Sequence, residues 1–484
     1  MFKKQQIILI TTVVLNRLDM FIESFGSFLA KTDVRDGVKV FHVVVNNGSN
    51  EETTKWLRKH NSYFDILIEL NSNCGVAKAV NLGWGQFYNT HKLKFDPDIV
   101  IHEGSENWLI QSLELLNQGV DIFGIPTSRI CPQVVQQVDN KRLIVPQNGE
   151  VVNGACFFVS NNMFKKLGYF SEDYGLYGYE DMDYNARVRL IKSLPLYLDG
   201  LNLEHIDLHS AMVYGYDKRE LKKVNSRKYE SNMDLYMQNI DNLFIHKSLF
   251  LSNPLVVIVM PVYNQAKYVR EAVYSILKQS YKNFKLIIVN DGSTDDLKSI
   301  IEQYYKDNRI VYLEKSNGGT GSALNLGFDY ARKNIDNIKY GTWVSGDNIY
   351  DSEFLLNLIT FMEENEQYGL VYAPFMERIE ETGKLIIPNQ HKQWDKQDMK
   401  KGCQMGICFL FNWFLKLTVG EYIKDVCEDF DMHIRMAAYS DFYFLNKKIL
   451  GVWRNHKEAM SNKVHNNKLS EANNECLRLA KEIL

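Results

Sequence analysis

Two acidic clusters are the residues of this sequence best suited to chemistry. Glu428 and Asp429 lie in CEDFD, and Glu180 and Asp181 lie in YEDMD, 248 residues earlier. A carboxylate held beside a reacting hydroxyl can take its proton as a new bond forms. Acidic residues are also favoured at a helix start, where they cap the helix and balance its dipole. The two roles are compatible, because a helix start can direct a carboxylate into a cleft, and the repetition favours a general base.

The acidic clusters belong to a repeat that runs along the chain. VNNGSNEE at 45–52 returns as VNDGSTDD at 289–296. Further matched pairs are Asn16 with Asn264, 248 residues apart, and Asn47 with Asp291, Gly75 with Gly319 and Asn81 with Asn325, each 244 residues apart. Spacing that drifts by only four residues indicates a duplicated fold with small loop insertions. We therefore predict two domains, residues 1–250 and 254–484, with their boundary in NLFIHKSLFLSNP at 242–254.

Each copy shows the same order of secondary structure. An apolar stretch (IILITTVVL; LVVIVMPVY) precedes a helical pattern (LDMFIESFGSFLA; YVREAVYSILKQ), and a second strand (VFHVVVNN; FKLIIVND) follows. Strands alternating with helices predict an α/β fold with a doubly wound, mostly parallel sheet in each domain. Ligands of such sheets bind beyond the carboxyl ends of the strands, where we expect Asn264, Asp291 and Asp347.

Composition excludes several classes of protein. The formal net charge of −3 is too acidic for a protein that coats nucleic acid, and the basic stretch at 217–230 is interpreted as a solvated helix face. The apolar run at 7–15 imitates a signal peptide, but no cleavage site follows it, so we predict the first strand there. No run reaches the ~18 apolar residues of a membrane helix. Seven cysteines without a CxxC pair fit reduced thiols. We predict a cytoplasmic protein, with peripheral membrane docking left open.

Six motifs of the second copy together resemble a known family. They are MPVYN, VNDGSTDD, SNGGTGSALNLGF, SGDN, CEDFDMHIR and WRNHKEAMS, which cover essentially all of 254–463. In this order they resemble the motifs of family-2 glycosyltransferases. The first copy is similar through TTVVLNR, VNNGSNEE, NSNCGVAKAVNLGW, HEGSEN, VNGACFFVS, YGYEDMDYNARVRL and HIDLH. The resemblance implies two tandem GT-A domains and an inverting enzyme that uses nucleotide-diphosphate sugars with Mn²⁺ or Mg²⁺.

The resemblance also implies roles for residues of the second copy. Asp347 and His456 are the expected metal ligands, and Asp429, preceded by Glu428, stands at the position of the base. The nucleotide and sugar are expected at Pro261, Tyr263, Asn264, Asp291, Gly319, Asn325 and Ser345. The family usually has Asp-x-Asp where this chain has Ser345-Gly346-Asp347, so the first carboxylate is missing.

In the first copy the expected metal ligands are Glu103 of HEGSE, 244 residues before Asp347, and His209, which aligns with His456. Asp181, preceded by Glu180, is the expected base. The donor is expected at Asn16, Asn47, Gly75 and Asn81. Asn47 replaces an aspartate, so this copy has either changed its donor or lost it. His205 and His209 have a spacing that suits zinc on a helix, but we do not adopt a zinc site, because HEGSE supplies no third ligand of that type.

The function predicted from these residues is metal-dependent transfer of a sugar, most simply from a UDP-sugar, to an acceptor hydroxyl. The second copy is expected to be catalytic, and the first is either a second active site or a binding copy. Three alternatives stay open: a polymerase that alternates two sugars, a phage-type transferase acting on DNA bases, and a carbohydrate- or nucleotide-binding scaffold. The glycan or other acceptor, the linkage and the oligomeric state are not specified by these motifs.

Overall fold

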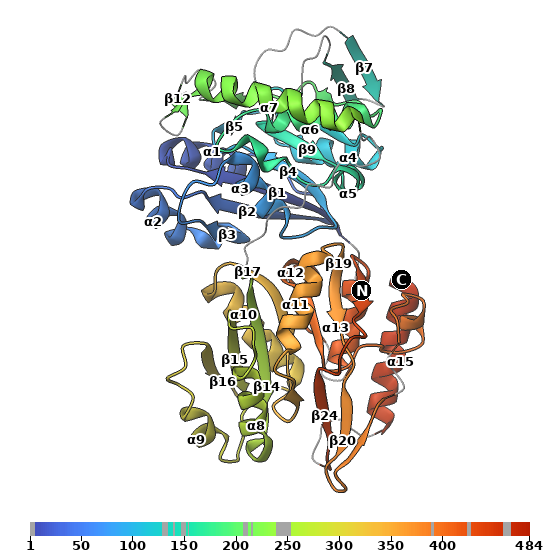
Figure 1. Ribbon diagram of the computed structural model, residues 1–484. Helices are drawn as coiled ribbons and strands as arrows, with labels where there is room; N and C mark the ends of the chain where they lie inside the picture. The colour runs from blue at the N-terminus through green and yellow to red at the C-terminus, as the bar shows by residue number, and fades with distance from the viewer. Residues whose placement is uncertain are drawn as a thin grey trace. The chain divides into compact units, whose positions relative to one another are not determined.

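The computed structural model divides the chain into two compact units (Figure 1). It describes residues 5–127, 134–138, 141–146, 152, 154–206, 212–213, 216–238, 253–388, 392–423, 427–457 and 466–484. We call the described residues 5–238 the N-terminal unit and those of 253–484 the C-terminal unit. Residues 242–252 of the predicted boundary lie outside the described residues.

The N-terminal unit is built on a nine-stranded sheet with the order β3-β2-β1-β4-β9-β6-β10-β8-β7. Its strands are β1 (Gln6–Val14), β2 (Val38–Asn46), β3 (Ile66–Glu69), β4 (His91–Phe95), β6 (Ile122–Gly124), β7 (Val134–Val138), β8 (Lys141–Val145), β9 (Cys156–Val159) and β10 (Leu196–Leu198). Two small sheets pair β5 (Ile99–Ile101) with β11 (Leu203–His205) and β12 (Met212–Val213) with β13 (Tyr216–Asp217). The helices are α1 (Leu18–Ala30), α2 (Glu51–Lys59), α3 (Val76–Trp84), α4 (Trp108–Asn117), α5 (Asn161–Leu167), α6 (Glu180–Leu190) and α7 (Lys218–Gln238), with 3₁₀ turns at Asn61–Tyr63 and Glu172–Tyr174.

The C-terminal unit has a seven-stranded sheet with the order β16-β15-β14-β17-β22-β19-β23. Its strands are β14 (Leu255–Val262), β15 (Phe284–Asn290), β16 (Ile310–Glu314), β17 (Ile338–Trp343), β19 (Tyr368–Tyr372), β22 (Phe409–Asn412) and β23 (Asp441–Phe444). A four-stranded sheet holds β18 (Ile349–Tyr350), β24 (Gly451–Asn455), β20 (Met376–Ile379) and β21 (Lys384–Ile386). The helices are α8 (Ala266–Leu277), α9 (Leu297–Glu302), α10 (Thr320–Asn334), α11 (Phe354–Glu364), α12 (Trp413–Val419), α13 (Glu428–Ala437) and α15 (Asn466–Ile483), with a 3₁₀ turn at Asp398–Lys400.

The first half of each sheet repeats the same topology. β1 lies parallel between β2 and β4, as β14 lies parallel between β15 and β17, and a third parallel strand (β3; β16) extends each sheet. β9 and β22 then run antiparallel to β4 and β17. Parallel neighbours need a crossover helix, which α1 and α8 supply. The predicted α/β fold class is confirmed, with antiparallel strands in the second half of each sheet.

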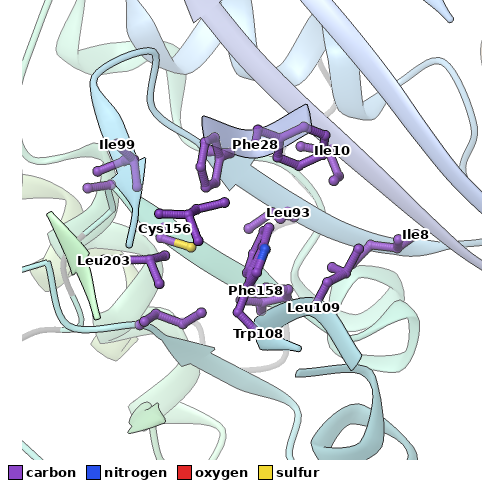
Figure 2. Close-up of a cluster of buried hydrophobic side chains, with 14 of the residues drawn as sticks. Ile8, Ile10, Phe28, Leu93, Ile99, Trp108, Leu109, Cys156, Phe158 and Leu203 are labelled. Carbon is purple, nitrogen blue, oxygen red and sulfur yellow. The ribbon is translucent and has the colours of Figure 1, made fainter. Parts of the chain in front are cut away.

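Strand β1 explains why the start of the chain looks like a signal peptide. It is the central strand of the parallel half of its sheet, so both of its faces are buried and its apolar residues run without alternation. Ile8 and Ile10 join a buried cluster with Phe28, Trp108 and Phe158 from other elements (Figure 2). The predicted first strand is therefore confirmed. Within the described residues, no helix is both long enough and apolar enough to cross a membrane.

Each unit contains a buried aspartate–arginine pair on its acidic helix. In α6, Nε of Arg187 donates to Asp183 at 2.8 Å, and both side chains are fully buried. In α13, Arg435 pairs with Asp431 at 2.7 Å in the same i,i+4 arrangement. These aspartates follow Asp181 and Asp429 by two residues, and the pairing assigns them to holding the helix rather than to chemistry.

Replacing Arg187 by Met is expected to lower the free energy of unfolding by about 3–5 kcal/mol, because it leaves the Asp183 carboxylate buried without its counter-ion. The guanidinium also donates to the carbonyls of Leu167 and Tyr169, at 2.8 and 2.9 Å. Urea unfolding measures the change. Arg58→Gln, which removes an exposed pair, is the control and should cost less than about 1 kcal/mol. A similar small loss for Arg187→Met would contradict the prediction.

Candidate active site

In the C-terminal unit the two predicted metal ligands lie side by side. Asp347 follows the end of β17 by four residues and is buried, with 7% of its surface exposed. Its Oδ2 accepts a hydrogen bond from Gln265 at 2.8 Å and lies 3.2 Å from Nε2 of His456. The Ser345 hydroxyl donates to its Oδ1 at 2.6 Å. The ring of Tyr268 packs over the His456 ring at 4.4 Å. The sequence therefore brings together an oxygen and a nitrogen ligand at the carboxyl end of a central strand.

Asp429 borders a cavity of about 200 Å³ in the same unit. It occupies the first turn of α13, and its Oδ1 accepts a hydrogen bond from the Phe430 amide at 2.7 Å. Burial raises the pKa of this carboxyl. Asn348, which directly follows Asp347, lines the same cavity together with Trp343 and Trp453. The candidate base and the loop that carries the candidate metal ligand therefore share one cavity.

The residue before each acidic helix has an unusual backbone conformation. Cys427 has φ of 58° and Tyr179 has φ of 76°, so both lie in the left-handed region although neither is glycine. Such conformations are uncommon and cluster at functional sites. Their recurrence at equivalent positions means that the same strained turn directs Asp429 and Asp181.

Strand pairing corrects the metal position predicted for the N-terminal unit. Lys94 of β4 and Trp343 of β17 lie opposite equivalent positions of β1 and β14. Counting four residues onward from each reaches Asp98 and Asp347. The spacing at this point is therefore 249 residues rather than 244, and Asp98 replaces Glu103 as the equivalent of Asp347. Glu103 is exposed beyond β5, away from the end of the central strand.

An Asp-x-Asp motif consequently stands in the N-terminal unit. Asp96 occupies the position of Ser345, so this unit keeps the carboxylate that the other lacks. The ligand atoms of Asp96, Asp98 and His205 all lie within 4.8 Å of one another. Nε2 of His205 is 3.0 Å from Oδ1 of Asp98, which repeats the aspartate–histidine contact of the C-terminal unit. His205 ends β11, which pairs with the strand that directly follows Asp98. His209, the ligand predicted here, lies outside the described residues.

The donor set fits a divalent cation. Carboxylate oxygens with one imidazole nitrogen are suitable ligands for Mn²⁺, and Mg²⁺ takes carboxylate oxygens. Oδ1 of Asp98 is buried and accepts no well-directed hydrogen bond within the described chain, although His205 lies close to it, so a lone pair is available. The N-terminal unit therefore offers three candidate ligands, whereas the C-terminal unit offers two, Asp347 and His456.

A chain of contacts joins this motif to the candidate base. The Lys94 ammonium pairs with Asp96 and also donates to the Gly154 carbonyl at 2.6 Å. The Gly154 amide in turn donates to Oδ2 of Asp181 at 3.2 Å. Burial, reinforced by the Asp181 charge, raises the pKa of Glu180 to about 7. Lys94 therefore offsets the charge of Asp96, and its contacts link the candidate metal ligands to Asp181 through Gly154.

Comparison with known proteins identifies the family. The sequence model described as "Glycosyl transferase family 2" matches residues 257–418, from β14 into α12. The C-terminal unit belongs to glycosyl transferase family 2. An uncharacterized glycosyltransferase of Rickettsia prowazekii is 32% identical over 204 residues, which is 40% of this chain and 61% of that protein. The hyaluronan synthase of Pasteurella multocida is 25% identical over 311 residues, 60% of this chain and 30% of the synthase.

Among solved structures, residues 1–349 of S. aureus TarS in complex with UDP-GlcNAc align with 18% identity and a TM-score of 0.40. The alignment covers 47% of this chain and 65% of the TarS chain. The chain thus spans less than two thirds of the length of each of these three proteins.

The Asp291 carboxylate of the family-2 unit holds the glycine-rich loop that follows β16. It accepts hydrogen bonds from the amides of Gly318 and Gly319 at 3.0 and 2.8 Å, and from Lys315 at 2.8 Å. In the N-terminal unit Asn47 holds the equivalent loop. It accepts from the Cys74 amide at 2.9 Å and donates to the Gly75 carbonyl at 3.3 Å. The amide thus replaces the carboxylate where the partner lysine has become Asn71, and nucleotide contact by either residue stays a prediction.

Exchanging Asp291 for Asn is expected to lower the free energy of unfolding of the family-2 unit by about 1–3 kcal/mol, because one of the two glycine amides loses a charged acceptor and Lys315 loses its ionised partner. Adding Lys315→Asn, which copies the pair found in the N-terminal unit, should recover part of this loss. A double-mutant cycle by urea unfolding measures the coupling, expected at more than about 0.5 kcal/mol. Strictly additive losses would show that the two residues do not act together.

The other residues predicted to bind the nucleotide-sugar donor make hydrogen bonds or turns that stabilise loops in both units. The side chains of Asn264 and Asn16 accept hydrogen bonds from the amides of Thr294 and Asn50 at 2.8 and 2.7 Å. Asn325 exchanges two hydrogen bonds of 2.8 Å with the Tyr422 backbone. Asn81 does the same with Phe170 at 2.9 and 3.0 Å. Gly319 and Gly75 directly precede α10 and α3, with φ of 85° and 91°. Pro261 lies within β14, and Tyr263, 49% exposed, follows it.

Proposed function

We propose that the chain is a glycosyltransferase with two active sites, one in each unit. Each site moves a sugar from a nucleotide-diphosphate sugar to an acceptor hydroxyl with inversion, and a UDP-sugar is the first donor to test. The observation that carries the proposal is the repeated arrangement of an aspartate–histidine pair, with the aspartate buried in each unit, and an acidic helix start. The fuller carboxylate set of the N-terminal unit favours an active second site over a vestigial copy.

Residues of the chain supply most of the proposed mechanism. Asp429 and Asp181 accept the proton of the incoming hydroxyl, and the helix start that carries Asp429 keeps its carboxylate at the cavity. A divalent cation held by Asp347 and His456, or by Asp96, Asp98 and His205, would offset the charge of the departing diphosphate. The raised pKa of Asp429 makes it a better proton acceptor than an ordinary aspartate.

Two sites in one chain suit a polymerase that adds two sugars in alternation. The hyaluronan synthase of Pasteurella multocida, by its name a polysaccharide synthase, supports this version of the proposal.

The proposal is tested by supplying the full chain with Mn²⁺ and with UDP- and GDP-sugars, singly and in pairs, while nucleoside diphosphate release and product length are measured. The two nucleotide sugars that the two sites use are expected to give long products when supplied together. With either one alone, synthesis is expected to stop after one addition. Long products from a single donor would contradict alternation. No release from any donor would contradict transferase activity.

A further inference from the structure

Helix α7 of the N-terminal unit carries an exposed basic surface near the candidate base. Residues 218–228 contain six basic residues and one acidic residue. The exposed basic side chains are Arg219, Lys222, Lys223, Arg227 and Lys228, which we call the α7 basic face. Four of them form no ion pair with any residue that the structure describes, and Lys228 lies 3.9 Å from Asp173. These cations are therefore available to an external partner.

The helix is fixed to the loop that leads into the acidic helix. Asn225 on its buried side donates to the carbonyls of Tyr174 and Tyr177 at 2.8 and 2.9 Å. The stem of Lys222 lies against Gly178, at 3.6 Å from where a side chain there would begin. This loop ends at Glu180, where α6 begins, and α7 packs along α6 (Figure 1). The α7 basic face is therefore held beside the segment that positions Asp181.

The repeat provides an internal comparison for this charge. In the C-terminal unit α15 packs on the acidic helix α13 as α7 packs on α6. Helix α15 has three basic and three acidic residues, whereas α7 has six basic and three acidic residues over its full length. A helix needed only to cover the acidic helix can be neutral, as α15 shows. Covering the acidic helix therefore does not account for the excess positive charge of α7.

We propose that the α7 basic face binds the acceptor of the N-terminal site, and that this acceptor is a glycan chain bearing carboxylates. The proposal rests on the proposed glycosyltransferase function. Regularly spaced anions on a polymer attract a row of cations and release their counter-ions, which strengthens binding at low salt. Duplex nucleic acid is disfavoured, because the basic surface is one stretch of about 16 Å on a chain with a net charge of −3.

The test measures binding of a fluorescent oligogalacturonate of about ten residues to the full chain by anisotropy. The variant Lys222→Gln/Lys223→Gln/Arg227→Gln is compared with a control of equal charge change, Lys59→Gln/Lys165→Gln/Lys166→Gln, at exposed positions of α2 and α5. We expect the first variant to bind at least tenfold more weakly and the control to stay within twofold of the wild type. The slope of log affinity against log salt concentration should also become shallower by about two to three in the first variant, because fewer counter-ions are released.

Three outcomes would overturn the proposal: equal affinity of the two variants, equal binding of a neutral maltodextrin of the same length, or tighter binding of duplex DNA than of the oligogalacturonate. Nucleoside diphosphate release by the wild-type chain is measured separately. Absence of release would count against the proposed function, whereas the anisotropy comparison decides the role of α7 independently.

Discussion

Replacing Asp181 or Asp429 by Asn is expected to lower transfer by its own unit by about 10²–10⁴-fold, because the amide cannot accept the proton of the acceptor. Nucleotide affinity should change by less than about twofold, since the proposed base acts on the acceptor and not on the donor. The amide has the shape of the carboxylate, and its oxygen can still accept the Met182 or Phe430 amide at the helix start. Incorporation of each sugar and the dissociation constant of UDP measure the two effects.

The exposed Asp36→Asn in the N-terminal unit is the matched control, with full transfer expected. Because each unit contains its own candidate base, each variant should remove one sugar from the product rather than all synthesis. Unchanged product length and composition in Asp181→Asn would reduce the N-terminal unit to a binding role. Full turnover in Asp429→Asn would place the base of the C-terminal unit on another residue.

The parts of the site that could be predicted are those whose spacing survived the duplication. The stretch 18–30 was predicted as a helix and forms α1, and the predicted pair Asp347 and His456 lies in contact. Asp181 and Asp429 stand at helix starts as expected. Local sequence patterns were enough for the helix and the helix starts, because these depend on neighbours close in the chain. The contact of Asp347 with His456, 109 residues apart, followed from the family resemblance.

The metal motif of the N-terminal unit was missed because one helix differs in length between the copies. Helix α3 has 9 residues, whereas its counterpart α10 has 15, so the spacing found before this helix no longer holds after it. The sequence of β4, the strand that follows α3, also gives no sign that the strand is buried. Lys92 and Lys94 make HKLKF look half exposed, yet both ammonium groups are buried against carbonyls or Asp96. A partnered buried lysine cannot be recognised from the hydrophobic pattern alone, because backbone carbonyls such as that of Tyr88, which accepts from Lys92, leave no signal in the sequence.

The sequence does not indicate His205 as a partner of Asp98 for a related reason. Its spacing from His209 resembles that of zinc ligands on a helix, but the chain forms a strand there. Strand pairing, which the sequence does not specify, brings His205 to Asp98. Long-range register therefore decides the ligand set, and local motifs do not.

The two units differ most in the charge placed around the candidate cation. The N-terminal unit offers two aspartates and a histidine, with Lys94 and Arg17 as nearby counter-ions. The C-terminal unit offers Asp347 and His456, with a serine at the remaining position. A site with more anionic ligands binds a hard cation more tightly. The N-terminal unit should therefore hold Mn²⁺ at lower concentrations than the C-terminal unit.

Replacing Asp98 or Asp347 by Asn is expected to weaken Mn²⁺ binding to the corresponding unit by at least tenfold and to lower its transfer with the same metal dependence. Ser345→Asp should have the opposite effect on the C-terminal unit, because it restores the carboxylate found at Asp96. Calorimetric titration of Mn²⁺ into each variant measures affinity, and sugar incorporation as a function of Mn²⁺ concentration measures function. Glu103→Gln is the control, because the spacing in the sequence assigns the metal ligand to Glu103 whereas strand pairing assigns it to Asp98. If Glu103→Gln weakened Mn²⁺ binding while Asp98→Asn did not, the register that equates Asp98 with Asp347 would have no functional meaning.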